Sequence, residues 1–252
     1  MSGQSGEIFI YDDVTTLAGA VATRIGTLAA ESIEARGVFH ISLAGGTTPR
    51  RLYETLALPE YGLRIDWSRV HVFFGDERCV PPDDPESNYG MARASLLDTV
   101  PLAETHIHRI VAESIERDGA ASDYATCLRQ VITARNGDVP TLDLVLLGIG
   151  PDGHVASLFP DTAILHETRR LVAPVFVKQK HAWRISITYP VINAAREVMV
   201  LATGGGKAEI LGQILGGQPH ELRYPAEMIA CPRGVHWYLD RDAARELTAS
   251  RR

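Results

Sequence analysis

The fold of this 252-residue chain is decided by Leu142-Asp143-Leu144-Val145-Leu146-Leu147 and by the loop that follows, Gly148-Ile149-Gly150-Pro151-Asp152-Gly153-His154. The first six residues are apolar except for Asp143, as is typical of a parallel strand that helices cover on both faces. The loop places three glycines, a carboxylate and a histidine at the end of that strand. We therefore expect a central strand of an α/β protein, with a ligand-binding loop at its carboxyl end.

Short apolar runs alternate with helical patterns before and after this stretch. The expected strands cover residues 8–11, 40–43, 71–74, 107–110, 171–176, 184–188, 198–202 and 235–239. The expected helices cover residues 17–33, 49–56, 88–97, 118–134, 207–215 and 240–248. This alternation predicts βαβ units and a parallel sheet. No repeat or low-complexity linker divides the sequence, so we expect a single domain over residues 1–252.

The composition argues against several classes of protein. Lys and Arg number 25 against 31 Asp and Glu, and the resulting formal net charge of −6 argues against nucleic acid as a partner. The sequence has no signal-peptide pattern and no apolar run of membrane-spanning length, which predicts a cytoplasmic protein. Cys79, Cys127 and Cys231 are odd in number and far apart, which argues against a disulfide framework.

Glycine-rich clusters follow four of the expected strands. They cover residues 45–49, 75–78, 148–154 and 203–207. Open α/β sheets bind ligands in a crevice at the carboxyl ends of their strands. We therefore expect the four loops to converge on one site. The alternative is four unrelated tight turns.

Two of these loops offer places for a phosphate group. Gly45-Gly46-Thr47-Thr48-Pro49 leads into an expected helix, where free backbone N–H groups can hold an anion. A threonine is also available there as a cap, so the alternative is a well-capped helix without a ligand. Thr203-Gly204-Gly205-Gly206-Lys207 adds a cationic side chain. It is not a Walker loop, because Leu201 and Ala208 stand where that motif requires glycine and Ser or Thr.

The loop at residues 148–154 has two interpretations. Its glycines spell the dinucleotide fingerprint G-x-G-x-x-G, but Pro151 and Pro160 leave no room for the helix that this fingerprint needs. Chemistry at His154 is the better interpretation, because an imidazole can accept a proton near neutral pH. The alternative is a structural histidine at the edge of the core.

The loop at residues 75–78 combines two carboxylates with a guanidinium. Asp76 could orient a hydroxyl or an imidazole, and Arg78 could hold an anion through two hydrogen bonds. The alternative is ordinary solvated charge. His106 and His108 occupy alternate positions without a convincing third ligand, so we predict no catalytic metal.

Three segments together resemble the lactonase members of the glucosamine-6-phosphate isomerase/6-phosphogluconolactonase family. They are residues 42–49, residues 74–89 and residues 150–160, the last reading Gly-Pro-Asp-Gly-His-Val-Ala-Ser-Leu-Phe-Pro. The resemblance covers about residues 8–239 and implies a Rossmann-like, doubly wound α/β fold, with flexible ends at 1–7 and 249–252. It implies hydrolysis of 6-phospho-D-glucono-1,5-lactone to 6-phosphogluconate in the oxidative pentose phosphate pathway. It implies no cofactor.

The resemblance also implies roles for individual residues. His154 is expected to activate water, with Asp152 or Asp76 orienting its ring and Arg78 or a glycine N–H stabilising the oxyanion. The residues expected to bind the phosphate and the sugar are Gly45, Gly46, Thr47, Thr48, Asn88, Gly153, Ser157, Arg184 and Lys207. We expect a monomer or a weak homodimer.

Three points stay open at this stage. Residues 177–183 depart from the family pattern, so any of Lys178, Lys180 and Arg184 could reach the substrate. Aminosugar-phosphate deamination is an alternative activity, although deaminases typically place a glutamate shortly after the histidine and residues 155–160 contain no carboxylate. A non-catalytic sugar-phosphate sensor is a second alternative. We expect no DNA-binding head of the kind such sensors need, because the first strand begins near residue 8.

Overall fold

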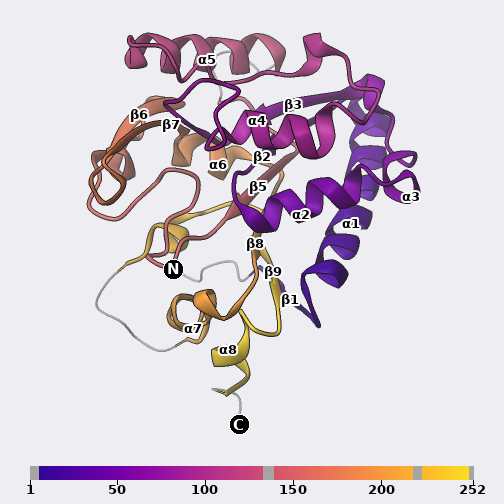
Figure 1. Ribbon diagram of the computed structural model, residues 1–252, viewed down its shortest axis with the longest axis vertical. Helices are drawn as coiled ribbons and strands as arrows, with labels where there is room; N and C mark the ends of the chain where they lie inside the picture. The colour runs from indigo at the N-terminus through magenta and orange to yellow at the C-terminus, as the bar shows by residue number, and fades with distance from the viewer. Residues whose placement is uncertain (1–5, 133–138, 218–222, 250–252) are drawn as a thin grey trace.

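The computed structural model describes residues 6–132, 139–217 and 223–249. Within these ranges the chain forms a six-stranded sheet and a three-stranded sheet, with helices packed around them (Figure 1). The predicted α/β class and the doubly wound, mostly parallel, Rossmann-like architecture are confirmed. The flexibility predicted for the chain ends falls mainly on residues 1–5 and 250–252, which lie outside the described residues.

The six-stranded sheet is parallel throughout and has the order β1-β9-β8-β5-β2-β3. Its strands are β1 (Ile8–Tyr11), β2 (Phe39–Leu43), β3 (Val70–Phe74), β5 (Leu144–Gly148), β8 (Glu197–Ala202) and β9 (Val235–Asp240). As predicted, β5 is an inner strand, and its first four residues are buried. Asp143 was expected within this strand but precedes it, and its buried carboxylate accepts hydrogen bonds from the backbone N–H of His40 and from Arg36.

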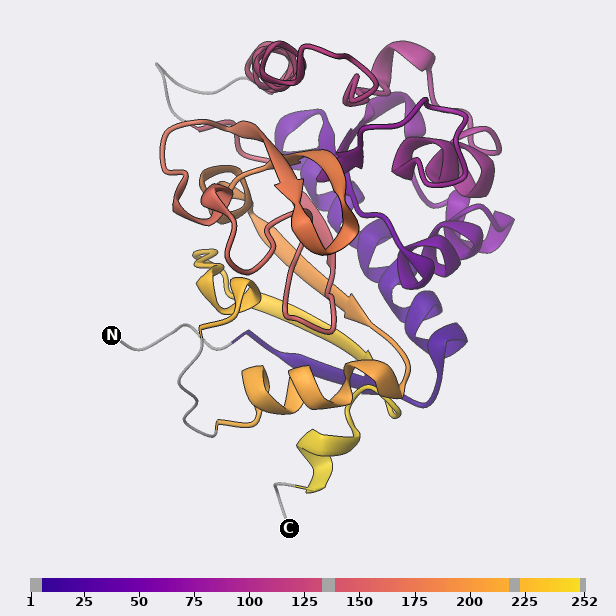
Figure 2. The same ribbon diagram turned by 60° about the vertical axis from the view of Figure 1, so that its left-hand side comes forward.

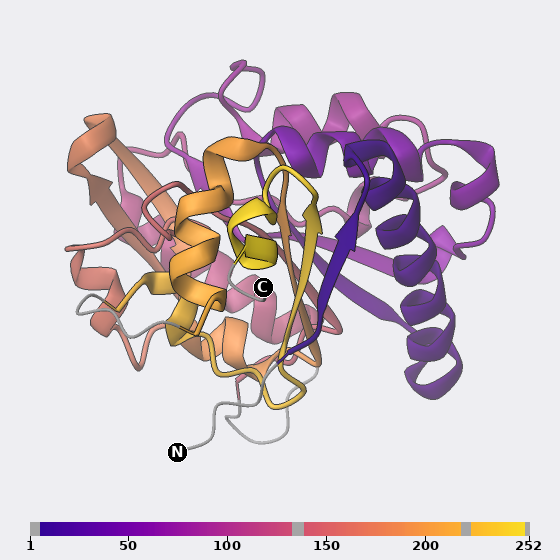
Figure 3. The ribbon, with the colours of Figure 1, turned by 90° about the horizontal axis from the view of Figure 1, so that it is seen from below.

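Helices cover both faces of this sheet. They are α1 (Val14–Arg36), α2 (Thr47–Leu56), α3 (Pro59–Gly62), α4 (Asn88–Ala92), α5 (Arg117–Val131), α6 (Tyr189–Ala194), α7 (Ala208–Leu215) and α8 (Arg245–Ala249). Helices α1 and α2 lie on one side of the sheet, whereas α7 and α8 lie on the other (Figures 2 and 3). Helix α1 begins where Asp13 accepts the N–H of Thr16 at 2.8 Å, and it ends at Gly37 in the left-handed conformation.

The path of the chain leaves a crevice between two central strands. From β2 the chain moves outward to β3, and it later returns to the other side of β2 to form β5, β8 and β9. The loops that follow β2 and β5 therefore run in opposite directions, as at the ligand sites of other open α/β sheets. These loops are close neighbours, since a Cβ on Gly148 would lie 3.7 Å from the carbonyl oxygen of Gly45.

The three-stranded sheet was not predicted. It consists of β4 (Asp76–Arg78), β7 (Ala182–Ile187) and β6 (Val172–Val177), paired antiparallel in the order β4-β7-β6. Strands β6 and β7 form a hairpin rather than a βαβ unit, because only the short turn Lys178–Lys180 and His181 separate them. Helix α5 packs against β6 (Figure 1).

Smaller differences concern the ends of elements. Residues 107–110 were expected to form a strand, but Ile107 makes only an isolated bridge to Val72. The helix expected at 88–97 divides into α4 and a π turn, Arg93–Leu97. The last helix is shorter than expected, because turns occupy residues 241–244. Residues 133 and 134, expected to end a helix, lie outside the described residues. In the described ranges, no helix is long and apolar enough to cross a membrane.

Candidate active site

The four glycine loops meet at one cavity, as the sequence predicts. The cavity has a volume of about 200 Å³, which suits a small metabolite better than a dinucleotide. Its lining comes from the loop after β2 and the start of α2, from the ends of β5 and β8 and the loops that follow them, and from single residues of β4 and β7. The lining includes nine of the predicted site residues: Gly45, Gly46, Thr47, Thr48, Asp76, Arg78, His154, Arg184 and Lys207.

The loop after β2 presents the start of helix α2 to the cavity. The alternative of a threonine-capped helix is wrong: the N-cap is Gly46, which has a φ of 108° and leaves the helix without a side-chain cap. A free first turn can donate its backbone N–H groups to an anion. Thr48 instead points its hydroxyl across the cavity edge, where Thr48 Oγ1 lies 2.6 Å from Thr203 Oγ1.

The loop after β8 holds Lys207 beside the same cavity. Gly204 adopts a φ of 83° and donates its N–H to both carboxylate oxygens of Asp240, at 3.0 and 2.9 Å. This contact ties the loop to the end of β9. Burial lowers the pKa of Lys207, and the charge of Asp152 partly offsets that effect. Lys207 is therefore a partly desolvated cation facing an anion-sized space.

The loop after β5 is a closed turn and not a helix start, as predicted. The N–H of Gly150 donates to the carbonyl of His154 at 2.8 Å, and the N–H of Gly153 donates to the carbonyl of Gly150 at 3.1 Å. Gly150 is required by close approach, because a Cβ there would lie 2.0 Å from His154 Nδ1. Gly153 has a φ of 75°, which favours glycine.

The imidazole of His154 is held by Asp152. Nδ1 of His154 lies 2.5 Å from Oδ1 of Asp152. Burial alone would raise the pKa of Asp152. The hydrogen bond to His154 and the charge of the imidazole outweigh burial, so this pKa lies below its ordinary value. Nε2 is the ring nitrogen left without a hydrogen-bond partner among the described residues. Of the two acids that the sequence left open, Asp152 is the one in contact with the imidazole.

Asp76 serves other partners. It accepts hydrogen bonds from Ser157 Oγ at 2.5 Å and from Asn88 Nδ2 at 3.1 Å, and it lies 3.8 Å from Arg184 Nη1. Asn88 and Ser157 are buried behind the cavity lining. Gly153 is also outside the lining. Substrate binding by these three residues stays a prediction. The side chains of Asn88 and Ser157 are already hydrogen-bonded inside the protein, where they support the loops.

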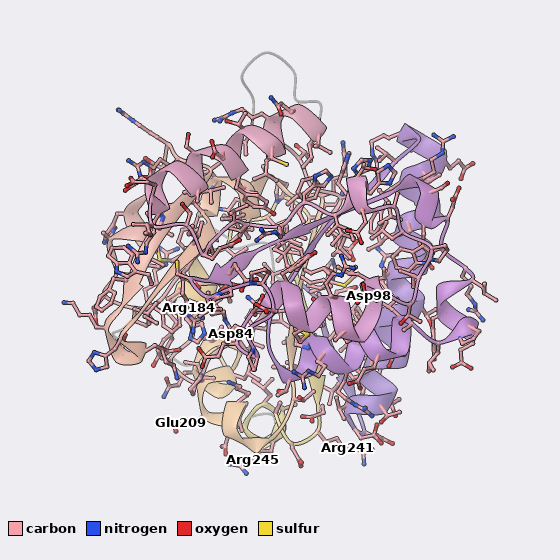
Figure 4. All side chains as sticks on the ribbon, turned by 45° about the horizontal axis from the view of Figure 1, so that its top comes forward. Asp84, Asp98, Arg184, Glu209, Arg241 and Arg245 are labelled. Carbon is pink, nitrogen blue, oxygen red and sulfur yellow. The ribbon has the colours of Figure 1, made fainter. Side chains whose placement is uncertain are left out.

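Two arginines stand side by side across the antiparallel sheet. Arg78 of β4 pairs in register with Arg184 of β7. The Arg184 side chain is only 12% exposed, and its pKa is lowered first by burial and further by the charge of Arg78, with Asp76 opposing. In the view of Figure 4, Arg184 falls inside the outline of the molecule, whereas Arg241 and Arg245 lie at its lower edge. Lys178 and Lys180 are exposed at the hairpin tip and outside the lining.

The charges around the cavity favour an anionic ligand. Among the residues that the structure describes, the lining contains Arg78, Arg184 and Lys207 but only one carboxylate, that of Asp76. Nη1 of Arg78 donates to the carbonyl of Glu86, and Nε of both arginines is buried without a partner among the described residues. A protein with an overall charge of −6 thus concentrates cations at one site.

Glu77 has a structural role that the sequence did not reveal. Its buried carboxylate accepts the backbone N–H groups of Arg78, Asn88 and Tyr89, each at 2.8 Å, and the hydroxyl of Ser87 at 3.0 Å. Burial nevertheless raises the pKa of Glu77. The only sequence signal was the acidic pair itself, in which Asp76 and Glu77 point to different partners because residues alternate along a strand.

A histidine cluster lies away from the cavity. His71 Nδ1 is 3.0 Å from His108 Nε2, and the rings of His71 and His106 stack at 4.0 Å. Burial and the neighbouring histidines lower the pKa of His71 and of His108 to about 4. No set of three or more His, Cys, Asp or Glu side chains in the described part of the chain has the arrangement needed to hold a metal ion.

Comparison with known proteins gives a consistent result. A family model for glucosamine-6-phosphate isomerases/6-phosphogluconolactonase matches residues 12–237. A 6-phosphogluconolactonase from Nostoc sp. is 37% identical over 239 residues, which cover 95% of this chain and 97% of the relative. One from Synechocystis sp. is 39% identical over 228 residues and covers 90% of both chains.

A solved structure agrees with these matches. The 6-phosphogluconolactonase from Trypanosoma brucei has a TM-score of 0.86 and 29% identity, with 98% of this chain and 100% of that chain covered. The family model and the relatives span nearly the whole sequence, including all four loops of the cavity. The chain therefore belongs to the glucosamine-6-phosphate isomerase/6-phosphogluconolactonase family.

Proposed function

We propose that this protein hydrolyses 6-phospho-D-glucono-1,5-lactone to 6-phosphogluconate, as a step of the oxidative pentose phosphate pathway. The observation that supports this most is the Asp152–His154 pair at the edge of a cavity lined by three cations. The names of the relatives favour the lactonase over the other activity that the family covers. The reaction needs no cofactor, because water is the nucleophile and a lactone is a reactive ester.

In this proposal the substrate phosphate binds at the first turn of α2. There the N–H groups of Thr47 and Thr48 are available, and Lys207 and Arg184 supply positive charge. This leaves the lactone ring between the phosphate end of the cavity and His154. Arg78, which lies beside Arg184, is then the candidate for binding the carbonyl oxygen as negative charge develops on it.

His154 acts as the general base through Nε2. Its Nδ1–H donates to Asp152, which fixes the tautomer that has a lone pair on Nε2. A water molecule forms the new bond to the lactone carbonyl carbon while Nε2 takes one of its protons. The carbon–ring-oxygen bond then breaks, the imidazolium returns the proton to the ring oxygen, and the new carboxylic acid ionises to solvent.

These groups are sufficient for an activated ester. A general base typically contributes roughly 10²–10⁴-fold to the rate, and one oxyanion donor roughly 10²–10³-fold. No covalent intermediate is needed. Ser157 is not a nucleophile in this mechanism, because its hydroxyl donates to Asp76 and the residue is buried.

We further propose that the protein works in the cytoplasm as a monomer or weak homodimer, without nucleic acid. The cationic side chains of the site are enclosed in a small cavity and the overall charge is −6, which disfavours binding to a polyanionic duplex. Sedimentation velocity across a concentration series tests the oligomeric state. A stable higher oligomer at micromolar concentration would contradict it.

One experiment separates the lactonase from the deaminase and from a sensor. Freshly made 6-phosphogluconolactone and glucosamine 6-phosphate are supplied separately, and acid release and ammonia release are measured against enzyme-free controls. We expect acid release only, with His154→Ala lowering kcat by orders of magnitude and leaving KM largely unchanged. Ammonia release would establish the deaminase, and binding without either product would establish a sensor.

A further inference from the structure

Phe159 contacts two residues of the site without lining the cavity. The residue is 1% exposed, and its ring stacks on the imidazole of His154 with centroids 3.8 Å apart and planes inclined by 21°. Cζ of Arg184 lies 5.4 Å from the centroid of the same ring. The carbonyl of Phe159 also accepts a hydrogen bond from Thr162 Oγ1 at 2.6 Å. The ring of Phe159 therefore contacts both His154 and the guanidinium of Arg184.

A tight turn brings Phe159 opposite His154. Val155 and Leu158 form an antiparallel bridge, and the N–H of Leu158 donates to the carbonyl of Val155 at 2.9 Å. The residues that flank this pair, His154 and Phe159, become neighbours as in a hairpin. Ala156 has a φ of 48°, a costly conformation for alanine, so the surrounding contacts must hold the turn.

Ser157 provides such a contact from within the turn. Its hydroxyl donates to Asp76 at 2.5 Å, and its backbone N–H donates to Ser186 Oγ at 3.3 Å. Both partners belong to the antiparallel sheet that also presents the two arginines. The position of Phe159 is thus fixed by the core and by that sheet.

The hydrogen bond to Asp152 does not by itself fix the imidazole. A single bond to Nδ1 leaves the ring able to tilt about that bond, and tilting changes the direction of the Nε2 lone pair. The Asp152 side chain is also 38% exposed, so its position is less firmly fixed than that of the buried Phe159. A buried aromatic face against the ring restricts the tilt.

We propose that Phe159 is a positioning residue that sets the plane of the His154 imidazole and thereby the direction of Nε2. Arg184 packs on the same ring, so Phe159 also keeps the base and this cation in a fixed relation. The inference rests on the proposed function, in which His154 is the general base. Phe159 acts through His154 and does not touch the substrate.

The test compares Phe159→Leu with Phe39→Leu. Phe39 is equally buried but lies at the start of β2, at the opposite end of the strand from the cavity, so it controls for a general loss of core packing. We expect kcat of Phe159→Leu to fall by roughly tenfold or more, since small misplacements of a catalytic group are costly. KM should change less than about threefold, and Phe39→Leu should retain kcat at a similar thermal midpoint. Equal kcat in the two variants overturns the proposal.

A double-mutant cycle with Asp152→Asn tests the route through His154. If both residues hold the same ring, the fold-decrease in kcat of the double variant differs by about threefold or more from the product of the fold-decreases in the two single variants. The cycle of Phe39→Leu with Asp152→Asn should be multiplicative. If the effects of Phe159→Leu and Asp152→Asn on kcat simply multiply, the two residues do not act together on His154. Phe159→Met, whose unbranched side chain adapts to irregular spaces in a core, replaces Phe159→Leu if the latter does not fold.

A readout independent of turnover separates this inference from the proposed function. In the NMR spectrum, the ring current of Phe159 should shift the ring protons of His154 upfield, and Phe159→Leu should remove that shift. His154 signals that are the same in both proteins overturn the stacking role. Absence of lactone hydrolysis by the unmodified protein, with the shift present, rejects the function and leaves the positioning intact.

Discussion

Gly150→Ala should disable the proposed catalytic base while leaving the fold intact. The added Cβ would lie 2.0 Å from His154 Nδ1, 2.2 Å from His154 Cε1 and 2.5 Å from Asp152 Oδ1. All three atoms belong to the hydrogen-bonded pair. The backbone of Gly150 does not have a positive φ, so the substitution perturbs the pair by contact and not by backbone strain.

The size of the effect follows from these distances. Ordinary contact with a Cβ begins near 3.4 Å, so Nδ1 must retreat by at least about 1.4 Å. This displacement is incompatible with both the 2.5 Å bond to Asp152 and the stack on Phe159. A shift of about 1 Å at a catalytic group costs on the order of 10²-fold in rate. We therefore expect kcat to fall by about 10²-fold or more.

The assay is the initial rate of acid release from fresh lactone, corrected for spontaneous hydrolysis. Gly26→Ala is the matched control, because a Cβ at this position in α1 meets no atom within 4 Å. It should retain full activity and gain about 0.5–1 kcal/mol in unfolding free energy. A Gly150→Ala protein with activity within threefold of the unmodified protein would refute the assignment of His154 and Asp152.

The other predictions concern substrate binding and stability. Lys207→Ala should raise KM by about 10–100-fold with kcat nearly unchanged, because a phosphate contact acts equally on substrate and transition state; a matching fall in kcat would contradict this. Glu77→Gln should lower the free energy of unfolding in urea by about 2–4 kcal/mol, since an amide nitrogen cannot accept from the donors that surround the carboxylate; an unchanged midpoint would count against that network. Stability should also fall as pH decreases from about 6.5 to 4, because His71 and His108 have a pKa of about 4 in the folded protein and the unfolded chain binds protons first. Urea titrations at pH 7, 6 and 5 should reveal this loss, and His71→Gln should reduce it; a flat profile would exclude the cluster as its cause.

The sequence was informative where the local pattern determines the structure. The apolar run that forms β5 needs helices on both faces, and the prolines at 151 and 160 exclude a long helix after the loop. Convergence of the four loops followed from strand direction alone, because parallel strands bring their carboxyl ends to one edge. The first two features depend on residues close together in the chain, and the third depends only on strand direction.

Features that depend on distant pairing could not be predicted. The register of Arg78 with Arg184 joins segments more than a hundred residues apart, and nothing in either segment specifies the other. The choice between Asp152 and Asp76 depended on the same sheet, because β4 directs Asp76 toward Ser157 and Asn88. The start of α2 had two interpretations, a free first turn and a threonine cap, because threonines are good caps by residue type. The structure decides for the free turn, since Gly46 occupies the cap position.

The register of Arg78 and Arg184 has a practical consequence for handling the protein. Two like charges held side by side raise the free energy of the empty site, and a bound anion relieves that repulsion. The melting temperature should therefore depend on the buffer anion, with stabilisation of about 2.7 kcal/mol when phosphate is a hundredfold above its dissociation constant. Phosphate buffer would thus act as a competitive ligand, and variants are comparable only in buffers that lack it.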